Sequence, residues 1–111
     1  MIDLPGRRSQ GHVDLLLLAA LGEGPKHGYA IARHLDEHSG GRFAIQEGTL
    51  YPALHRLEAD GLVASERTTV SGRQRRVYTI TADGAVALAA RRQEWQQYAA
   101  GISGVLGEAS R

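Results

Sequence analysis

The densest positive charge in the chain lies between residues 67 and 76. This segment holds four arginines, opposed nearby by Glu66; they are Arg67, Arg73, Arg75 and Arg76. Of the 13 basic residues in the chain, all but Lys26 are arginine. A guanidinium can bind a phosphate or a guanine edge through two parallel hydrogen bonds, which an ammonium group cannot. The pattern indicates a phosphate-binding surface, and the alternative is an ordinary solvated charged surface.

Residues 48–62, just before the arginines, have the pattern of a short amphipathic helix. At 100° per residue, Leu50, Leu54 and Leu57 fall within about 60° of one another, which predicts a core stripe. The opposite face carries small and polar residues, and two more flank its N-terminal end: Pro52, His55, Arg56 and Ala59, then Thr49 and Tyr51. Alternatively, Tyr51 packs on the first helix and Arg56 pairs with Glu58 or another neighbour.

The ends of this helix can also be predicted. It should start between Glu47 and Thr49 and stop at Gly61. Pro52 is tolerated if the helix begins near Thr49, because the N–H groups of the first turn have no partner within the helix.

A hairpin follows the helix. Two strand-like runs, residues 62–70 and 75–80, flank Ser71-Gly72, and the tip residues Gly72, Arg73 and Gln74 should project freely. Tyr78 and Ile80 share one side of their strand and should anchor the hairpin to the core.

Three further helices are expected, at residues 11–21, 27–38 and 82 to about 100, with Thr81 as the N-cap of the last. Residues 43–45 should form a short extended piece that packs inward. The order is helix, helix, helix, strand, strand, helix. The predicted fold is mainly α with a small β-hairpin, a winged helix-turn-helix.

In such a fold the third helix enters the major groove of DNA and the hairpin, or wing, contacts phosphates or the adjacent minor groove. The helix would supply specificity and the wing affinity. The predicted DNA-binding residues are Thr49, Tyr51, Pro52, His55, Arg56, Arg73, Gln74, Arg75 and Arg76.

The composition sets wider limits. A chain of 111 residues and 12.0 kDa suits one domain. Net charge is only +1, so the distribution of charge carries the nucleic-acid signal. There is no cysteine, which excludes disulfides and thiolate metal sites and fits a cytoplasmic protein. No apolar run approaches the ~18 residues of a membrane span.

Three segments of the chain resemble the PadR family of bacterial transcriptional regulators. They are Gly48-Thr49-Leu50-Tyr51-Pro52 with its continuation to Leu62, Gly72-Arg73 with its continuation to Gly84, and His27-Gly28-Tyr29-x-Ile31. The resemblance covers roughly residues 12–100. It implies a winged helix-turn-helix, a C-terminal dimerisation helix and repression relieved by an effector. Many members have Ser or Thr with Pro where this chain has Gln46-Glu47, which affects the cap of the third helix.

The expected organisation is a flexible arm at 1–10, a DNA-binding domain at 11–81, a dimerisation helix at 82–106 and a tail at 107–111. The last helix carries a coiled-coil-like seam with Tyr98 beside it: Leu88, Arg92, Trp95, Ala99, Ile102 and Leu106. A second copy of the chain is the expected partner, and the alternative is packing on the first helix. In a dimer two Trp95 rings would form a slot for a planar aromatic effector; simple interface packing is the alternative.

Other classes of protein have weaker support. His34 and His38 have metal-compatible i, i+4 spacing but no third ligand in sequence context, so neither a metal nor another cofactor is expected. No motif of a hydrolase, metalloprotease or phosphate-binding loop is present. A protein-interaction module on the same fold and a metal-responsive regulator stay as alternatives. The sequence predicts a homodimeric repressor that binds a roughly palindromic DNA operator.

Overall fold

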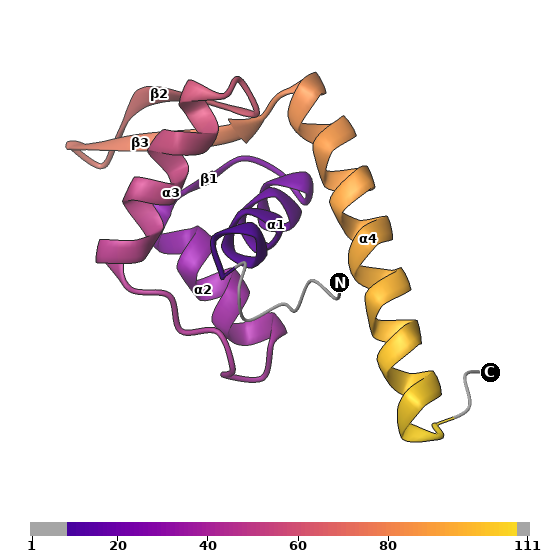
Figure 1. Ribbon diagram of the computed structural model, residues 1–111. Coiled ribbons are helices and arrows are strands. Elements are labelled where there is room, and N and C mark those ends of the chain that lie inside the picture. Colours follow the sequence, from indigo (N-terminus) through magenta and orange to yellow (C-terminus); the bar gives the residue numbers. More distant parts are fainter. Residues whose placement is uncertain (1–8, 109–111) are drawn as a thin grey trace.

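The computed structural model describes residues 9–108, and the elements within them follow the predicted order with one addition (Figure 1). The elements are α1 (Ser9–Gly22), β1 (Lys26–His27), α2 (Gly28–His38), α3 (Glu47–Ala59), β2 (Val63–Val70), β3 (Arg73–Ile80) and α4 (Ala82–Leu106). The predicted flexible arm lies outside the described residues except for its last two positions, which belong to α1, and most of the predicted tail also lies outside them. The winged helix-turn-helix prediction is confirmed.

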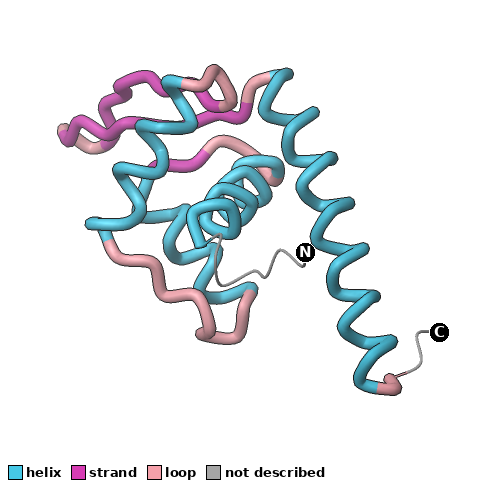
Figure 2. Tube along the Cα trace, in the orientation of Figure 1, coloured by secondary structure: helices cyan, strands magenta, loops and turns pink. Residues whose placement is uncertain are grey.

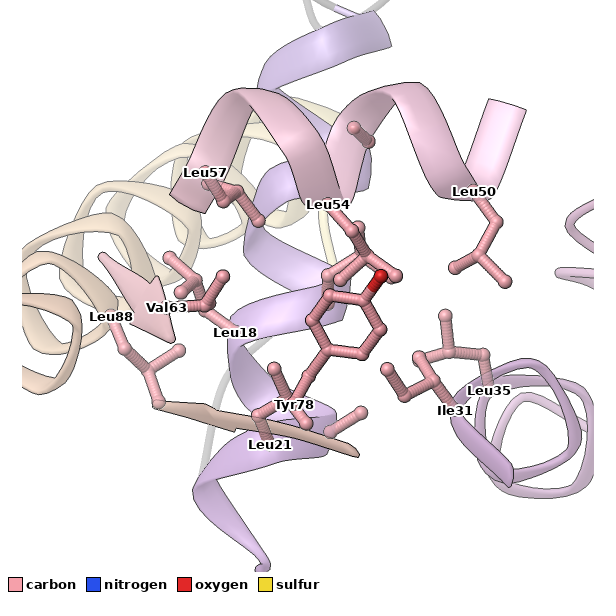
Figure 3. Packing of buried hydrophobic residues seen from close by; sticks show 13 residues of the cluster. Leu18, Leu21, Ile31, Leu35, Leu50, Leu54, Leu57, Val63, Tyr78 and Leu88 are labelled. Atoms are coloured by element: carbon pink, nitrogen blue, oxygen red, sulfur yellow. The ribbon is translucent and has the colours of Figure 1, made fainter. Parts of the chain in front are cut away.

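Helix α1 lies at the centre of the domain. Its Leu17, Leu18 and Leu21 side chains are fully buried, and no residue from 12 to 21 is exposed. The helix contacts α2, α3, β3 and α4, which together cover it on every side. Figure 3 shows the Tyr78 ring of β3 among these leucines and the Leu54 side chain of α3, as the sequence predicted for Tyr78.

The sheet has three antiparallel strands in the order β1-β3-β2, where the sequence predicted two. Lys26 pairs with Tyr78 and His27 with Val77, so His27 belongs to a strand rather than to the second helix. A two-residue strand has no periodicity to read, and its pairing with β3 is long-range. The β2–β3 turn has positive φ at Ser71 (52°) and Gly72 (78°), the backbone of a tight two-residue hairpin.

Helix α3 begins at Glu47, with Gln46 as an N-cap whose side chain makes no capping hydrogen bond. The acidic Glu47 lies in the first turn, where it favours the helix dipole. Pro52 therefore lies beyond the first turn. We expected Pro52 to be tolerated because the helix would begin near Thr49, and the earlier start at Glu47 removes that explanation. The ring nitrogen of Pro52 leaves the carbonyl of Gly48, which is exposed, without a partner in the helix.

The end of α3 is as predicted. Gly61 is left-handed (φ 77°), and Leu62 and Gly61 donate their N–H groups to the carbonyls of Leu57 (2.9 Å) and Glu58 (3.0 Å). These two bonds form the pattern of a Schellman stop.

Thr81 is the N-cap of α4, as predicted: its hydroxyl group accepts the N–H of Gly84 at 3.0 Å and donates to the carbonyl of Gly61 at 2.7 Å. The helix runs through Gly101 and Gly104 and stops at the left-handed Gly107, so it spans the whole of the segment 82–106 expected for the dimerisation helix. Its second half stands away from the domain (Figure 2).

One further expectation was wrong. Phe43 is exposed rather than packed inward, although Ile45 does pack on the core. Within residues 9–108 the structure has no helix long and apolar enough to cross a membrane.

Gly84 provides a test of how α4 joins the domain. A Cβ at this position would overlap the carbonyl oxygen of Leu62 and approach Ile80 Cγ1 to 2.8 Å, whereas nothing lies within 4 Å of one at Gly101. We expect Gly84→Ala to destabilise the fold by roughly 1–3 kcal/mol or more. The matched change Gly101→Ala should stabilise it by roughly 0.5–1 kcal/mol. Urea unfolding measures both, and equal stability of the two variants would contradict the packing.

Candidate nucleic-acid interface

One face of α3 is fully exposed along its length. It carries Thr49, Pro52, His55 and Ala59, as the sequence predicted. Leu50, Leu54 and Leu57 on the opposite face are buried in the core. Thr49 and His55 give the exposed face polar groups. Pro52 and Ala59 have small side chains, so a bulky partner can approach the helix closely.

Tyr51 lies at the edge of this face and is half-buried. Its ring and hydroxyl pack against Gly28, the first residue of α2, where any added Cβ would collide with them. The predicted alternative was packing on the first helix, and the observed contact is instead with the second.

Arg56 is not free on the outer face, which corrects the prediction for this residue. Its guanidinium donates to Asp14 of α1 at 2.8 Å, and the same carboxylate lies 3.4 Å from Arg91 of α4. The Asp14 side chain is only 13% exposed and that of Arg56 is 37% exposed. Asp14 is 42 positions away, so no local pattern indicated this pair.

The wing presents its arginines to solvent. Arg76 lies directly across the hairpin from Arg67, so two like charges share the sheet face that also carries the buried Tyr78. Arg76 donates to the Ser65 hydroxyl at 3.0 Å, which donates to Glu58 of α3 at 2.8 Å. This chain of hydrogen bonds holds the wing against α3.

The remaining wing positions also lack acidic partners. Arg73 and Gln74 are exposed at the tip, and Arg73 faces the exposed Val70. Within residues 9–108 the structure records no ion pair for any wing arginine. Glu66 is the one acidic residue on the two wing strands, so arginines outnumber it four to one, and such a surplus of exposed cations is the electrostatic pattern of a polyanion site.

Arg75 lies on the other face of the wing, beside the start of α2. Its Nη1 donates to Nε2 of His27 at 2.8 Å, and the His27 ring stacks on Tyr29 with centroids 6.3 Å apart. Partial burial, and then the charge of Arg75, lower the pKa of His27, which favours the neutral ring needed to accept this bond.

Sequence reasoning missed both neighbours of Arg75. Tyr29 follows Gly28 in the first turn of α2, and its side chain is 66% exposed. Helical periodicity could have predicted this exposure, because at 100° per residue Tyr29 lies on the side of the helix away from the buried Ile31 and Leu35.

The predicted seam of α4 has a buried part near the start of the helix and a largely exposed part further along. Leu88 is buried in the core of its own domain, beside Gly22 of α1, so it cannot face a second chain. The later seam residues Arg92, Trp95 and Ile102 are exposed, Trp95 by 44%, and Ala99 is half-buried. The Trp95 ring meets His12 of α1 edge-on at 5.5 Å and stacks on Tyr98 at 6.0 Å.

The two histidines with metal-compatible spacing contact each other. The rings of His34 and His38 stack with centroids 3.9 Å apart, and Nδ1 of His38 lies 2.9 Å from the carbonyl oxygen of His34. Burial and the neighbouring His38 lower the pKa of His34. In the described part of the chain, no three His, Cys, Asp or Glu side chains gather as a metal site would require.

An exposed polar helix beside a basic two-stranded arm defines a winged helix-turn-helix protein. The model of the transcriptional regulator PadR-like family matches residues 17–90, and the chain belongs to that family. Transcriptional regulator Rv3488 of Mycobacterium tuberculosis is 40% identical over 92 residues, covering 83% of each chain. The chain is thus a transcriptional regulator and not an enzyme.

Solved structures agree with this family. A PadR family transcription regulator from Clostridium difficile is 30% identical, with a TM-score of 0.75 over 86% of this chain and 98% of that one. The crystal structure of smu.1704 from Streptococcus mutans is 28% identical, with a TM-score of 0.79 over 92% of this chain and 93% of that one.

Proposed function

We propose that the protein is a homodimeric repressor that binds a specific, roughly palindromic DNA operator. The observation that carries this proposal is the pairing of an exposed polar face on α3 with a wing whose arginines have no acidic partner among the described residues. A polyanion would compensate these charges. As a bacterial transcription factor it would act in the cytoplasm, where the DNA lies.

The two surfaces have different roles in this proposal. Phosphate contacts from Arg73, Gln74, Arg75 and Arg76 give affinity that depends little on sequence. Thr49 and His55 are the exposed polar groups of α3, so they are the proposed base readers in the major groove. Pro52 and Ala59 allow close approach. Arg56 has a supporting role, because its guanidinium holds α3 to α1 through Asp14.

A second copy of the chain is the proposed partner of α4. The second half of the helix carries exposed apolar side chains, which are Trp95, Ile102, Val105 and Leu106. A two-fold pair would place two α3 helices on half-sites about one helical turn apart.

A small planar aromatic molecule is the proposed effector. Trp95, Tyr98 and His12 already form an aromatic cluster between α1 and α4. In a dimer the two clusters would lie on one interface, so a ligand there would change how the copies sit on DNA.

Removal of a wing charge tests DNA binding. We expect Arg73→Ala to weaken binding to all duplexes by a similar factor and to lower the salt slope by about one. Thr49→Ala should change the preference among sequences instead. The control is Arg42→Ala, which removes the same charge from the exposed loop before α3. Fluorescence anisotropy measures all three, and salt-independent or absent DNA binding would favour the protein-interaction module.

Introduction of a charge on α4 tests the dimer. Ile102 and Val86 are both exposed on this helix, but only Ile102 lies on the seam. We expect Ile102→Glu to shift the protein from dimer to monomer in sedimentation velocity and Val86→Glu to leave it dimeric. If both variants sediment as the wild type does, α4 is not the dimer contact.

Tryptophan fluorescence tests the effector, since Trp95 is the one tryptophan of the chain. Planar aromatic dyes should quench its emission, and Trp95→Leu should abolish their binding in calorimetry. A broad panel of such dyes with no effect on the dimer would reject the effector site.

A further inference from the structure

The cluster of Arg75, His27 and Tyr29 is not explained by the core or by the dimer contact. It joins β3 of the wing to the first turn of α2, across 48 positions of sequence. Helix α4 packs against α1 and β3, on the opposite side of the domain from the wing tip (Figure 1). Tyr29 is exposed, and Tyr51 of α3 packs against Gly28 between His27 and Tyr29. The cluster is therefore open to a partner that also contacts α3.

The arginines of the wing are divided between the two faces of the β2–β3 hairpin. Arg67 and Arg76 share the face of β2–β3 that carries Tyr78, and Arg75 lies on the other face with Val77. His27 is paired with Val77 in β1, which places its ring on the Arg75 face. Contacts made by Arg76 therefore cannot substitute for contacts made by Arg75.

The chemistry of the cluster fits a phosphate. His27 accepts one N–H of Arg75, and a neutral ring does not offset the positive charge of Arg75. Glu66 lies on the same face of the sheet, but no ion pair between it and Arg75 is recorded among residues 9–108. The other guanidinium donors and the Tyr29 hydroxyl have no hydrogen-bond partner recorded among residues 9–108. A phosphate oxygen accepts from both kinds of donor.

We propose that Arg75, His27 and Tyr29 form a second site for the DNA backbone, distinct from the wing tip. Arg75 and Tyr29 bind a phosphate, and His27 is a positioning residue that holds the guanidinium and supports the Tyr29 ring. The site extends the protein's grip from the wing to the start of α2. It rests on the proposed function, because a protein that does not bind DNA would not use it.

The test compares variants on an operator duplex and an unrelated duplex by fluorescence anisotropy. Tyr29→Phe removes one hydroxyl and should weaken both complexes by a similar factor, roughly three- to tenfold. The salt slope should stay unchanged, because no charge is lost. Phe43→Leu alters another exposed aromatic side chain, outside the cluster, and should leave affinity unchanged.

A double-mutant cycle tests the positioning role of His27. His27→Ala should weaken binding in the wild-type background but have little further effect when Arg75→Ala is present. Urea unfolding of each variant establishes that the fold is intact. Additive losses would show that His27 does not act through Arg75 and would overturn its role.

Arg73→Ala separates the two possible failures. If Arg73→Ala weakens DNA binding while Tyr29→Phe has no effect, this site is rejected and the proposed function stands. If neither change affects binding to either duplex, the proposed function itself fails.

Discussion

Burial of α1 on every side is the constraint on which the rest of the structure depends. No residue from 12 to 21 is exposed, because α2, α3, β3 and α4 surround the helix. This arrangement uses the leucine face of α3 and the tyrosine face of β3. It leaves the polar face of α3 and the outer wing in solvent, and these uncovered parts form the proposed DNA-binding surface.

A polar side chain of α1, Asp14, connects the helix to its neighbours through ion pairs rather than through apolar packing. Asp14 receives Arg56 from α3 and lies near Arg91 from α4, so one carboxylate contacts both the helix proposed to read DNA and the helix proposed to dimerise. Removing one partner of a partly buried pair leaves a charge without compensation, which costs more than the pair contributes. Arg56 is therefore better suited to fixing the angle of α3 than to reading a base.

The sequence predicted the features that repeat locally. Leucine spacing at 50, 54 and 57 placed the core face of α3, alternation placed Tyr78, and Ser71-Gly72 placed the turn. Features made by distant pairs were not predictable. β1 exists only through its pairing with β3, and the Arg56–Asp14 and Arg75–His27 contacts join segments more than 40 positions apart.

The central claim is that one continuous surface, from α3 across the wing to the start of α2, binds DNA. Titration of an operator duplex into isotope-labelled protein, followed by backbone amide chemical shifts, tests it most directly. The account predicts the largest changes at residues 49–59, 67–76 and 27–29, and small changes in the loop at 39–44. Changes centred on that loop or on the outer side of α4, with the wing unaffected, would contradict it.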